Sequence, residues 1–335
     1  MNRDNKERLM IIDGNSLLHR AFYALPLLAT KDGVYTNGVY GFLTMLYKIQ
    51  EDYDIDYLSV AFDKKGPTFR HETFEEYKAN RASTPNELAL QFPILKEILK
   101  AMNIHQIELE GYEADDIAGT LSRIGEEKGM EVILVTGDRD YLQLTSDDTR
   151  VLITKRGITE LEEYDRSKII EEYGITPEQL IHLKGLMGDK SDNIPGVPGI
   201  GEKTGIKLLK QFSTIENLYD NIDEVKGKKT KESLIEHKSM ALLSKELGEI
   251  IRTVPIEFSI EELKVKEPDW NRLVELYEMF EFGSLLSKIP DDKITTKVDS
   301  TYEVKYKILK NNDFDSITKE LDSHDSFGFK FVFED

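Results

Sequence analysis

The sequence predicts an α/β protein whose first part is a doubly wound, mostly parallel sheet and whose second part is all-helical. Across residues 9–140, short apolar runs alternate with segments in which apolar residues recur at helical spacing. Such alternation is typical of βαβ units, which build parallel sheets with helices on both faces. From about residue 167 the pattern changes to helices joined by short turns, with Gly and Pro concentrated at 185–205.

The strands are predicted from short runs of Val, Ile and Leu that are bounded by Gly or Asp. Such runs are typical of strands buried on both faces of a parallel sheet. We expect buried strands at 9–12, 58–62 and 132–136, and a further strand at 104–109.

Helices are predicted where apolar residues share one face of a helix. Asn15 is a good N-cap for the first of them, which carries SLLHRAFYAL. The other helices are expected at 41–53, 87–102 and 115–128 in the first part, and at 206–220, 231–251 and 269–288 in the second.

The composition excludes several kinds of site. With no cysteine among its 335 residues, the chain cannot form a disulfide, a thiolate zinc site or a thiol nucleophile, which fits a cytoplasmic protein. The start MNRDNKERLMIIDG has charges on both sides of a very short apolar run, so we expect no signal peptide or membrane span there. A formal net charge of −19 argues against a nucleic-acid binder with a basic surface, unless part of the acidic excess surrounds bound cations.

Three of the predicted strands end in aspartate: Asp13, Asp63, and Asp138 with Asp140 close behind it. Ligands of open α/β sheets bind at the carboxyl ends of the strands, so we expect these four carboxylates at one edge. Because carboxylates repel one another, such a cluster is costly unless cations lie among them. The alternative is that each aspartate only caps the following helix or turn. We interpret the four together as a magnesium site.

Two further acidic clusters extend this set. Glu113, Asp115 and Asp116 open a predicted helix, where acidic residues could merely favour the helix dipole. Asp189 and Asp192 lie in a Gly-rich segment that could be only a turn. Oxygen ligands without Cys or a His-x-His pair select Mg²⁺ or Mn²⁺ over zinc. Two such ions about 3.5–4 Å apart promote in-line displacement at a phosphodiester.

The segment 196–204, GVPGIGEKT, is glycine-rich but does not match a nucleotide-binding loop. A P-loop needs Lys directly after its second glycine, a dinucleotide loop needs a third glycine three residues on, and the chain has neither. We interpret the segment as a helix–hairpin–helix whose backbone N–H groups approach a DNA phosphate. The contacts, none of them base-specific, would come from Gly199, Gly201, Lys203 and Thr204. A tight helix–helix turn without a ligand is the alternative.

Residues 64–92 interrupt the strand–helix alternation directly after Asp63 and contain several Lys and Arg residues. Lys78 and Arg81 are three positions apart, so on a helix they would share one face. Tyr77 would then be free to stack on a base. Basic residues on an exposed helix are usually only solvated, but the neighbouring acidic edge favours a functional role for these.

Five ordered stretches carry a resemblance to a known family. They are IIDGNSLLHRAFYAL, AFDKKGPTFRHETFEEYKANR, GYEADDIAGTL, VTGDRDYLQL and GLMGDKSDNIPGVPGIGEKTG. With them the chain resembles the 5′-nuclease (5′-3′ exonuclease) region of bacterial DNA polymerase I, within the flap endonuclease superfamily. The resemblance covers residues 9–205 and continues less specifically to about 290. It implies a PIN-like sheet with a helical arch over the site at about 64–92.

For the site, the resemblance implies two Mg²⁺ or Mn²⁺ ions and a K⁺ at the glycine loop. In the arch, Lys78 and Arg81 would act as catalytic groups that steer the scissile phosphate and stabilise its charge. Arg20 and Tyr77 would hold the single-stranded 5′ end. The ligands of the two divalent ions would be Asp13, Asp63, Glu113, Asp115, Asp116, Asp138, Asp140, Asp189 and Asp192.

Pattern and resemblance together predict four parts along the chain. These are a nuclease core at 1–166, a helical helix–hairpin–helix subdomain at 167–290, a polar linker at 291–301, and the truncated start of a further domain at 302–335. The last part resembles the first strand of a 3′–5′ exonuclease domain, whose metal motif is Asp-x-Glu. Lys330 and Val332 stand at the two acidic positions, so we expect that such a domain would not proofread.

The expected function is that of a structure-specific, Mg²⁺-dependent 5′-3′ exonuclease and flap endonuclease. Its substrates would be DNA with a 5′ flap, a nick or a free 5′ end, and primer RNA on DNA. We expect a cytoplasmic monomer, natively fused to a C-terminal polymerase domain and active in replication and repair. Three alternatives are open. They are an inert DNA-junction binding module, an α/β phosphatase, which would need a second carboxylate two residues after Asp13, and a PIN-type ribonuclease, which usually lacks the helix–hairpin–helix.

Overall fold

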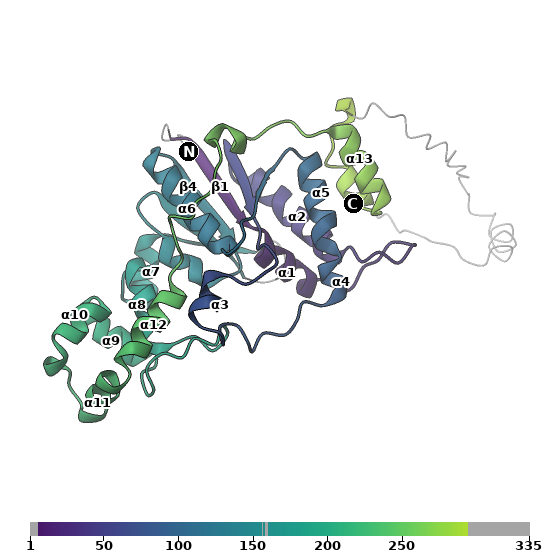
Figure 1. Ribbon diagram of the computed structural model, residues 1–335. Helices are drawn as coiled ribbons and strands as arrows, with labels where there is room; N and C mark the ends of the chain where they lie inside the picture. The colour runs from purple at the N-terminus through teal and green to yellow at the C-terminus, as the bar shows by residue number, and fades with distance from the viewer. Residues whose placement is uncertain (1–5, 156, 158–159, 294–335) are drawn as a thin grey trace, which may run out of the picture. The chain divides into compact units, whose positions relative to one another are not determined.

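The computed structural model describes residues 6–155, 157 and 160–293. Its centre is a six-stranded sheet in the order β3-β2-β1-β4-β5-β6. Figure 1 labels the neighbouring strands β1 and β4. Neighbouring strands are parallel except for β6, which pairs antiparallel with β5. The strands are β1 (Arg8–Asp13), β2 (Tyr57–Ala61), β3 (His105–Ile107), β4 (Glu131–Thr136), β5 (Thr149–Thr154) and β6 (Leu161–Tyr164). The predicted mostly parallel sheet is confirmed.

Helices cover both faces of this sheet. They are α1 (Gly14–Ala24), α2 (Asn37–Asp52), α5 (Gln91–Ala101), α6 (Ala114–Glu127) and α13 (Trp270–Met279), with the 3-10 helix η1 (Arg139–Leu144). On β1, Met10 and Ile12 pack with α1, α2, α5 and α13, whereas Leu9 and Ile11 pack on the opposite side with α6 and η1. Figure 1 shows α2 and α5 on one side of the sheet and α6 on the other. Because successive strand residues face opposite sides, a fully apolar strand requires this double cover.

The chain beyond β6 is helical, as predicted. Its helices are α7 (Arg166–Tyr173), α8 (Pro177–Met187), α9 (Glu202–Phe212), α10 (Ile215–Asp220), α11 (Lys228–Glu236) and α12 (Lys238–Gly248), followed by α13 and α14 (Gly283–Leu286). Apolar side chains of α8 to α12 form a cluster of their own, which includes Leu186, Leu209 and Ala241. Ile250 and Leu263 then bring the chain back to the sheet, where they join the cluster under α6.

The first helix begins earlier than predicted. Its N-cap is Asp13, whose carboxylate accepts a hydrogen bond from the Ser16 N–H at 2.9 Å. The prediction that Asn15 is the cap is wrong, because Asn15 already lies inside α1. The residue that ends β1 therefore also starts α1, which leaves the side chain of Asn15 available for another partner.

The segment 64–92 is only partly helical. Its last two residues begin α5, and its own helices are α3 (Phe69–Thr73) and α4 (Asn86–Ala89). Between them Lys78 has a φ of 55°, outside the right-handed helical region, and its N–H donates to the Asp192 carbonyl at 2.9 Å. The prediction that Lys78 and Arg81 share a helix face is therefore wrong. A turn, attached to the loop that contains Asp192, positions both side chains.

The described residues belong to one compact unit that extends to Ile294. The predicted linker beyond residue 293 and the predicted strand with Lys330 and Val332 lie outside the described residues. Among the helices that the structure describes, none combines the length and the apolar character needed to cross a membrane.

Candidate metal and nucleic-acid site

A pocket of about 260 Å³ lies where the central strands end. It is lined by five of the nine predicted metal ligands: Asp13, Asp63, Glu113, Asp115 and Asp138. The other side chains in its wall are Asn15, Ser16, His19, Lys78, Arg81, Ala114 and Tyr141. The pocket thus combines carboxylates with two basic groups.

The register of the parallel strands explains why these carboxylates meet. Asp13, the last residue of β1, lies beside Ala61, the last residue of β2. β4 ends at Thr136 on the other side of β1. Asp63 and Asp138 each follow their own strand by two residues, so all three aspartates leave the sheet at its carboxyl edge.

Asp13 is buried, with 6% of its surface exposed, and both of its oxygens are engaged. Besides the Ser16 N–H at one oxygen, the Thr136 hydroxyl donates to the other at 2.9 Å. Burial, together with the charges of Asp63 and Asp138, raises the pKa of Asp13 to about 7. An ionised Asp13 is therefore costly in this pocket, and a bound cation would remove that cost.

Asp63 is positioned by two donors from different elements. The Asn15 amide donates to one carboxylate oxygen at 2.8 Å, and the Ala114 N–H at the start of α6 donates to the other at 2.8 Å. Burial and the neighbouring charge of Glu113 raise the pKa of Asp63. The carboxylate is thus oriented into the pocket by α1 and α6 together.

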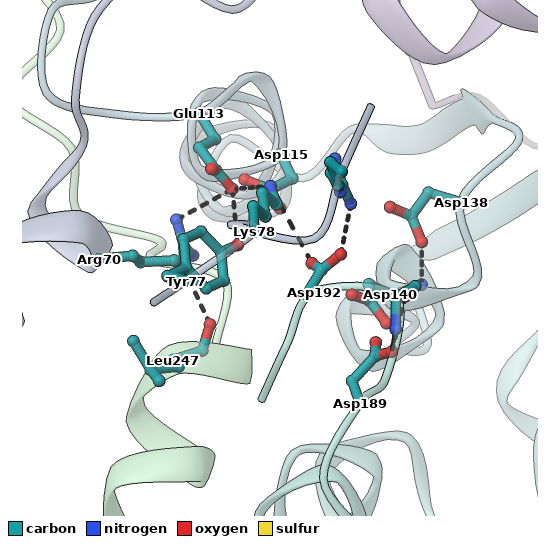
Figure 2. Close-up of polar contacts among 12 residues, drawn as sticks. Arg70, Tyr77, Lys78, Glu113, Asp115, Asp138, Asp140, Asp189, Asp192 and Leu247 are labelled. Carbon is teal, nitrogen blue, oxygen red and sulfur yellow. Dashed lines mark hydrogen bonds and ion pairs between the residues drawn. The ribbon is translucent and has the colours of Figure 1, made fainter. Parts of the chain in front are cut away.

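Glu113 precedes α6 and is the most engaged carboxylate of the pocket. Its Oε2 accepts hydrogen bonds from the Tyr77 hydroxyl at 3.1 Å and from the Lys78 Nζ at 2.8 Å, as Figure 2 shows. Asp115 lies in the first turn of α6, where burial and the charge of Asp116 raise its pKa well above the ordinary value. The two acidic side chains face the pocket together.

Tyr77 is not free to stack on a base in this structure. Only 4% of its surface is exposed, and its ring packs with Ile194 and Leu247. Its hydroxyl is used by Glu113. The prediction of an exposed Tyr77 is therefore wrong, because the turn directs the ring into the protein rather than toward solvent.

Asp116 does not line the pocket. Its two oxygens accept from the Nη1 and Nη2 groups of Arg70, both at 2.7 Å, and Asp116 is fully buried. Each Asp116 oxygen also accepts from a backbone N–H, so that each has two donors, whereas the oxygens of Asp13 and Asp63 have one each. The geometry does not support the prediction that Asp116 is a metal ligand.

The remaining acidic residues form a second group. Carboxylate oxygens of Asp140, Asp189 and Asp192 lie within 4.8 Å of one another. Lys184 of α8 forms ion pairs with Asp140 and, at 2.8 Å, with Asp189. Burial and the charge of Asp138 raise the pKa of Asp140 to about 6. Burial alone would raise the pKa of Asp189, but the neighbouring Lys184 ammonium lowers it to about 2.

Lys78 and Arg81 lie between the two carboxylate groups. Lys78 Nζ is 2.8 Å from Glu113 and 4.0 Å from Asp192. The side chains of Lys78 and Asp192 face each other in Figure 2. Arg81 forms an ion pair with Asp192. Burial alone would lower the pKa of Lys78, but the negative charge of Glu113 raises it, so the Lys78 ammonium stays protonated. The structure therefore brings both predicted basic residues to the acidic site.

The glycine loop lines a second, larger pocket. This pocket, of about 710 Å³, is lined by Asp140, Lys184 and Asp189 and also by Ile200 and Gly201. Gly199 has a φ of 80°, and a side chain at Gly199 or Gly201 would meet no atom within 4 Å. Lys203 and Thr204 lie in the first turn of α9, directly after the loop. The loop backbone is therefore open to a ligand.

Arg20 lies apart from the carboxylates. Its guanidinium donates to the Lys155 carbonyl, and it lines a separate small pocket with Tyr23, Ala24, Lys155 and Gly157. The structure does not bring Arg20 into the wall of the acidic pocket.

Comparison with known families explains this arrangement. Residues 8–174 match the model of the N-terminal resolvase-like domain of 5′-3′ exonucleases, and residues 175–271 match that of their C-terminal SAM-fold domain. The chain belongs to the 5′-3′ exonuclease family. The sheet with its carboxylates corresponds to the first domain, and the helices with the glycine loop correspond to the second.

Curated relatives of this exonuclease chain are DNA polymerases. It is 52% identical to DNA polymerase I of Bacillus caldotenax over 284 residues, which is 85% of the chain and 32% of that protein. It is 49% identical to DNA polymerase I of Bacillus subtilis over 298 residues, which is 89% of the chain and 34% of that protein. The chain therefore spans about a third of the length of these relatives.

Solved structures share the exonuclease fold. A T5 5′-exonuclease structure with bound divalent metal ions (zinc) has a TM-score of 0.61 and 26% identity, covering 72% of this chain and 89% of that one. The catalytic core of Rad2, solved with a DNA substrate, has a TM-score of 0.57 at 17% identity, covering 85% and 92%. The second likeness concerns the fold alone.

Three residues at or next to these carboxylates were not predicted as site residues from the sequence. The sequence pattern predicts Asn15 as a helix cap and assigns no specific role to Lys184 or to Arg70, one of several basic residues in the segment 64–92. Asn15 and Arg70 lie inside stretches that carry the resemblance, which was a usable signal. In the sequence, Lys184 has no feature that distinguishes it from other helix residues. Only the packing of α8 against η1 brings it to Asp140.

Proposed function

We propose that the chain is a structure-specific, Mg²⁺-dependent 5′-3′ exonuclease and flap endonuclease that hydrolyses phosphodiesters and leaves 5′-phosphates. The observation that carries this proposal is the placement of Lys78 and Arg81 between two groups of carboxylates. The donors on both sides are carboxylate oxygens, which suit Mg²⁺ or Mn²⁺. Membership of the 5′-3′ exonuclease family supports the same reaction.

In this proposal the two carboxylate groups each hold divalent metal. Asp13, Asp63, Glu113, Asp115 and Asp138 would form the first group, and Asp140, Asp189 and Asp192 the second. When bound, the ions supply an activated water and stabilise the attacking and leaving oxygens of an in-line displacement.

The basic residues would act on the scissile phosphate. Lys78 and Arg81 are charged donors that lie within reach of both carboxylate groups, so a phosphate bound over the pocket would lie between them and the acidic edge. Their charges would offset the negative charge that develops on the phosphoryl oxygens. No covalent intermediate with the protein is required, because the nucleophile is water.

The glycine loop would bind the duplex beside the cleavage site. The open backbone at Gly199 and Gly201 allows N–H groups to approach a phosphate, with Lys203 and Thr204 adjacent and a K⁺ as a further ligand of the loop. Because one pocket is lined both by Gly201 of this loop and by Asp140, duplex binding at the loop would lie next to the cleavage site. The substrates would be 5′ flaps, nicks, free 5′ ends and primer RNA on DNA.

The relatives suggest the cellular setting. Because they are DNA polymerases of about three times the aligned length, we infer that the chain acts as a monomeric nuclease region fused to a polymerase domain. It would remove primers and displaced strands in the cytoplasm during replication and repair.

A 5′-labelled flap duplex tests the proposal. The native chain should cleave at the junction with Mg²⁺, and Asp138→Ala or EDTA should abolish cleavage. Asp52→Ala, which changes an exposed carboxylate paired with Lys48, is the matched control and should cleave normally. Tight flap binding without cleavage by the native chain would instead identify an inert DNA-junction binding module.

A further inference from the structure

Arg70 is the largest fully buried side chain among the described residues, with 1% of its surface exposed. A buried guanidinium is costly unless its donors are satisfied. Its Nη1 and Nη2 groups bind the two oxygens of Asp116 in parallel, each at 2.7 Å. This is the forked geometry that Arg forms with a carboxylate and Lys cannot reproduce.

The same guanidinium joins three separate segments. From α3, Arg70 reaches Asp116 in α6, and its Nε donates to the Leu247 carbonyl at 3.0 Å near the end of α12. Nη2 also donates to the Glu249 carbonyl at 2.7 Å. Figure 2 shows Arg70 beside Tyr77 and Glu113, with Leu247 below them. Arg70 therefore ties the segment that carries Lys78 to the end of α12 and to α6.

Asp116 connects Arg70 to Glu113, which lines the acidic pocket. Its Oδ2 accepts from the Glu113 N–H at 3.2 Å, and its Oδ1 accepts from the Ile251 N–H at 2.8 Å. Each oxygen thus receives Arg70 and one backbone donor. Arg70 Nη1 in addition lies 3.5 Å from Glu113 Oε2. The pair contacts both the backbone and the carboxylate of Glu113, which lines the pocket while Arg70 and Asp116 do not.

We propose that Arg70 and Asp116 are a positioning pair that sets the metal affinity of the first carboxylate group. They do so by holding Glu113 in place, and neither side chain touches the ion. The proposal rests on the proposed function, since it assumes that the pocket binds divalent metal. Partners of metal ligands typically change metal affinity by about 10–100-fold when they are mutated.

A purely structural pair would behave differently. Replacing a buried ion pair with apolar residues of similar volume is often neutral or stabilising for the fold. If the pair served only stability, Arg70→Met combined with Asp116→Leu would leave metal binding unchanged. If the pair positions Glu113, the double variant should fold and bind metal weakly.

Calorimetric titration of the full chain with Mn²⁺ alone tests whether the Arg70–Asp116 pair sets the metal affinity. Arg70→Lys should weaken Mn²⁺ binding by about 10-fold or more, because a single ammonium cannot hold both Asp116 oxygens. Arg252→Lys is the matched control. Arg252 also ties the chain after α12 to α6, through Glu126 at 2.6 Å and the Gly119 carbonyl, and it does not line the acidic pocket. Its variant should bind Mn²⁺ like the native chain.

Flap cleavage adds a second measurement. With Arg70→Lys, the Mg²⁺ concentration for half-maximal cleavage should rise by about the same factor, and flap binding in EDTA should not change. Unchanged Mn²⁺ affinity in both Arg70→Lys and the Met–Leu double variant would overturn the positioning role and leave the proposed function standing. A native chain that takes up no Mn²⁺ would overturn both.

Discussion

Asn15 and Asp63 form two hydrogen bonds with each other, although they are 48 positions apart in the chain. The Asn15 side-chain Nδ2 donates to the Asp63 carboxylate at 2.8 Å, and the Asp63 backbone N–H donates to the Asn15 side-chain Oδ1 at 3.1 Å. The first turn of α1 thus orients a carboxylate that follows β2.

This relationship predicts the effect of Asn15→Ala. Asp63 would lose the donor that orients its carboxylate, so the Mg²⁺ requirement for flap cleavage should rise by about 10–100-fold. Rates measured across a Mg²⁺ series test this, with Asn221→Ala as a control, because Asn221 bonds only within its own helix turn and lines neither pocket. An unchanged Mg²⁺ dependence in Asn15→Ala would contradict the role of the pair.

Lys78→Ala is expected to slow cleavage itself. Lys78 lies between Glu113 and Asp192, where its charge would offset that of the scissile phosphate. Loss of such a charged donor typically reduces the rate by about 10²–10³-fold. Single-turnover rates at saturating Mg²⁺ and enzyme measure the step directly. Lys64→Ala, which removes an exposed lysine 3.6 Å from Glu110, should retain the native rate.

Gly201→Ala separates duplex binding from stability. A methyl group there meets no atom within 4 Å, and the φ of −102° is one that Ala adopts, so the melting temperature should not change. If a phosphate approaches this backbone, the methyl group should still weaken flap-duplex binding. Gly283→Ala also meets open space and is the control for binding. Equal duplex affinity in both variants would argue against a phosphate at the loop.

Gly199→Ala should differ, because its φ of 80° strains any L side chain. The expected cost is about 1–2 kcal/mol of unfolding free energy in addition to weaker binding. Denaturant unfolding beside the same binding assay distinguishes the two glycines.

The stability of the metal-free chain should fall as the pH rises. The pKa of Asp13 is about 7 in the folded chain, against an ordinary value of 3.8. Between these values the folded chain keeps a proton that the unfolded chain has lost, so raising the pH favours unfolding until about pH 7. Asp140, with a pKa of about 6, acts in the same direction.

Thermal unfolding in EDTA at several pH values between about 4 and 8 tests this prediction. Asp13→Asn should flatten the dependence, because the amide carries no titrating proton. Asp52→Asn, at an exposed carboxylate, should leave the slope as it is. A native slope that survives in Asp13→Asn would assign the pH dependence to other groups.

Secondary structure was predictable where local chemistry decides it. The runs that became β1, β2 and β4 are mostly apolar at their centres, as is typical of strands buried on both faces of a parallel sheet. β5 was missed because its sequence TRVLIT includes polar residues, and β6 was missed because LEEY is half acidic. Both are recognised as strands only through their pairing at the edge of the sheet. The helix predicted at 87–102 proved to be two helices divided at Leu90.

The sequence by itself determined the composition of the site. Asp13, Asp63 and Asp138 follow buried strands, and parallel strands bring their carboxyl ends to one edge whatever the details of packing. The basic residues Lys78 and Arg81 were predicted on other grounds, because they lie in the basic segment 64–92 that directly follows Asp63 and within a stretch that carries the family resemblance.

Only the tertiary structure decided how these groups are used. Asp116 is directed to Arg70, Tyr77 is buried against Leu247, and Lys184 reaches Asp140 from another helix. Each of these contacts joins segments that are at least 40 positions apart. Hydrogen bonds between distant segments depend on where whole elements pack, and no local pattern of residues encodes that placement.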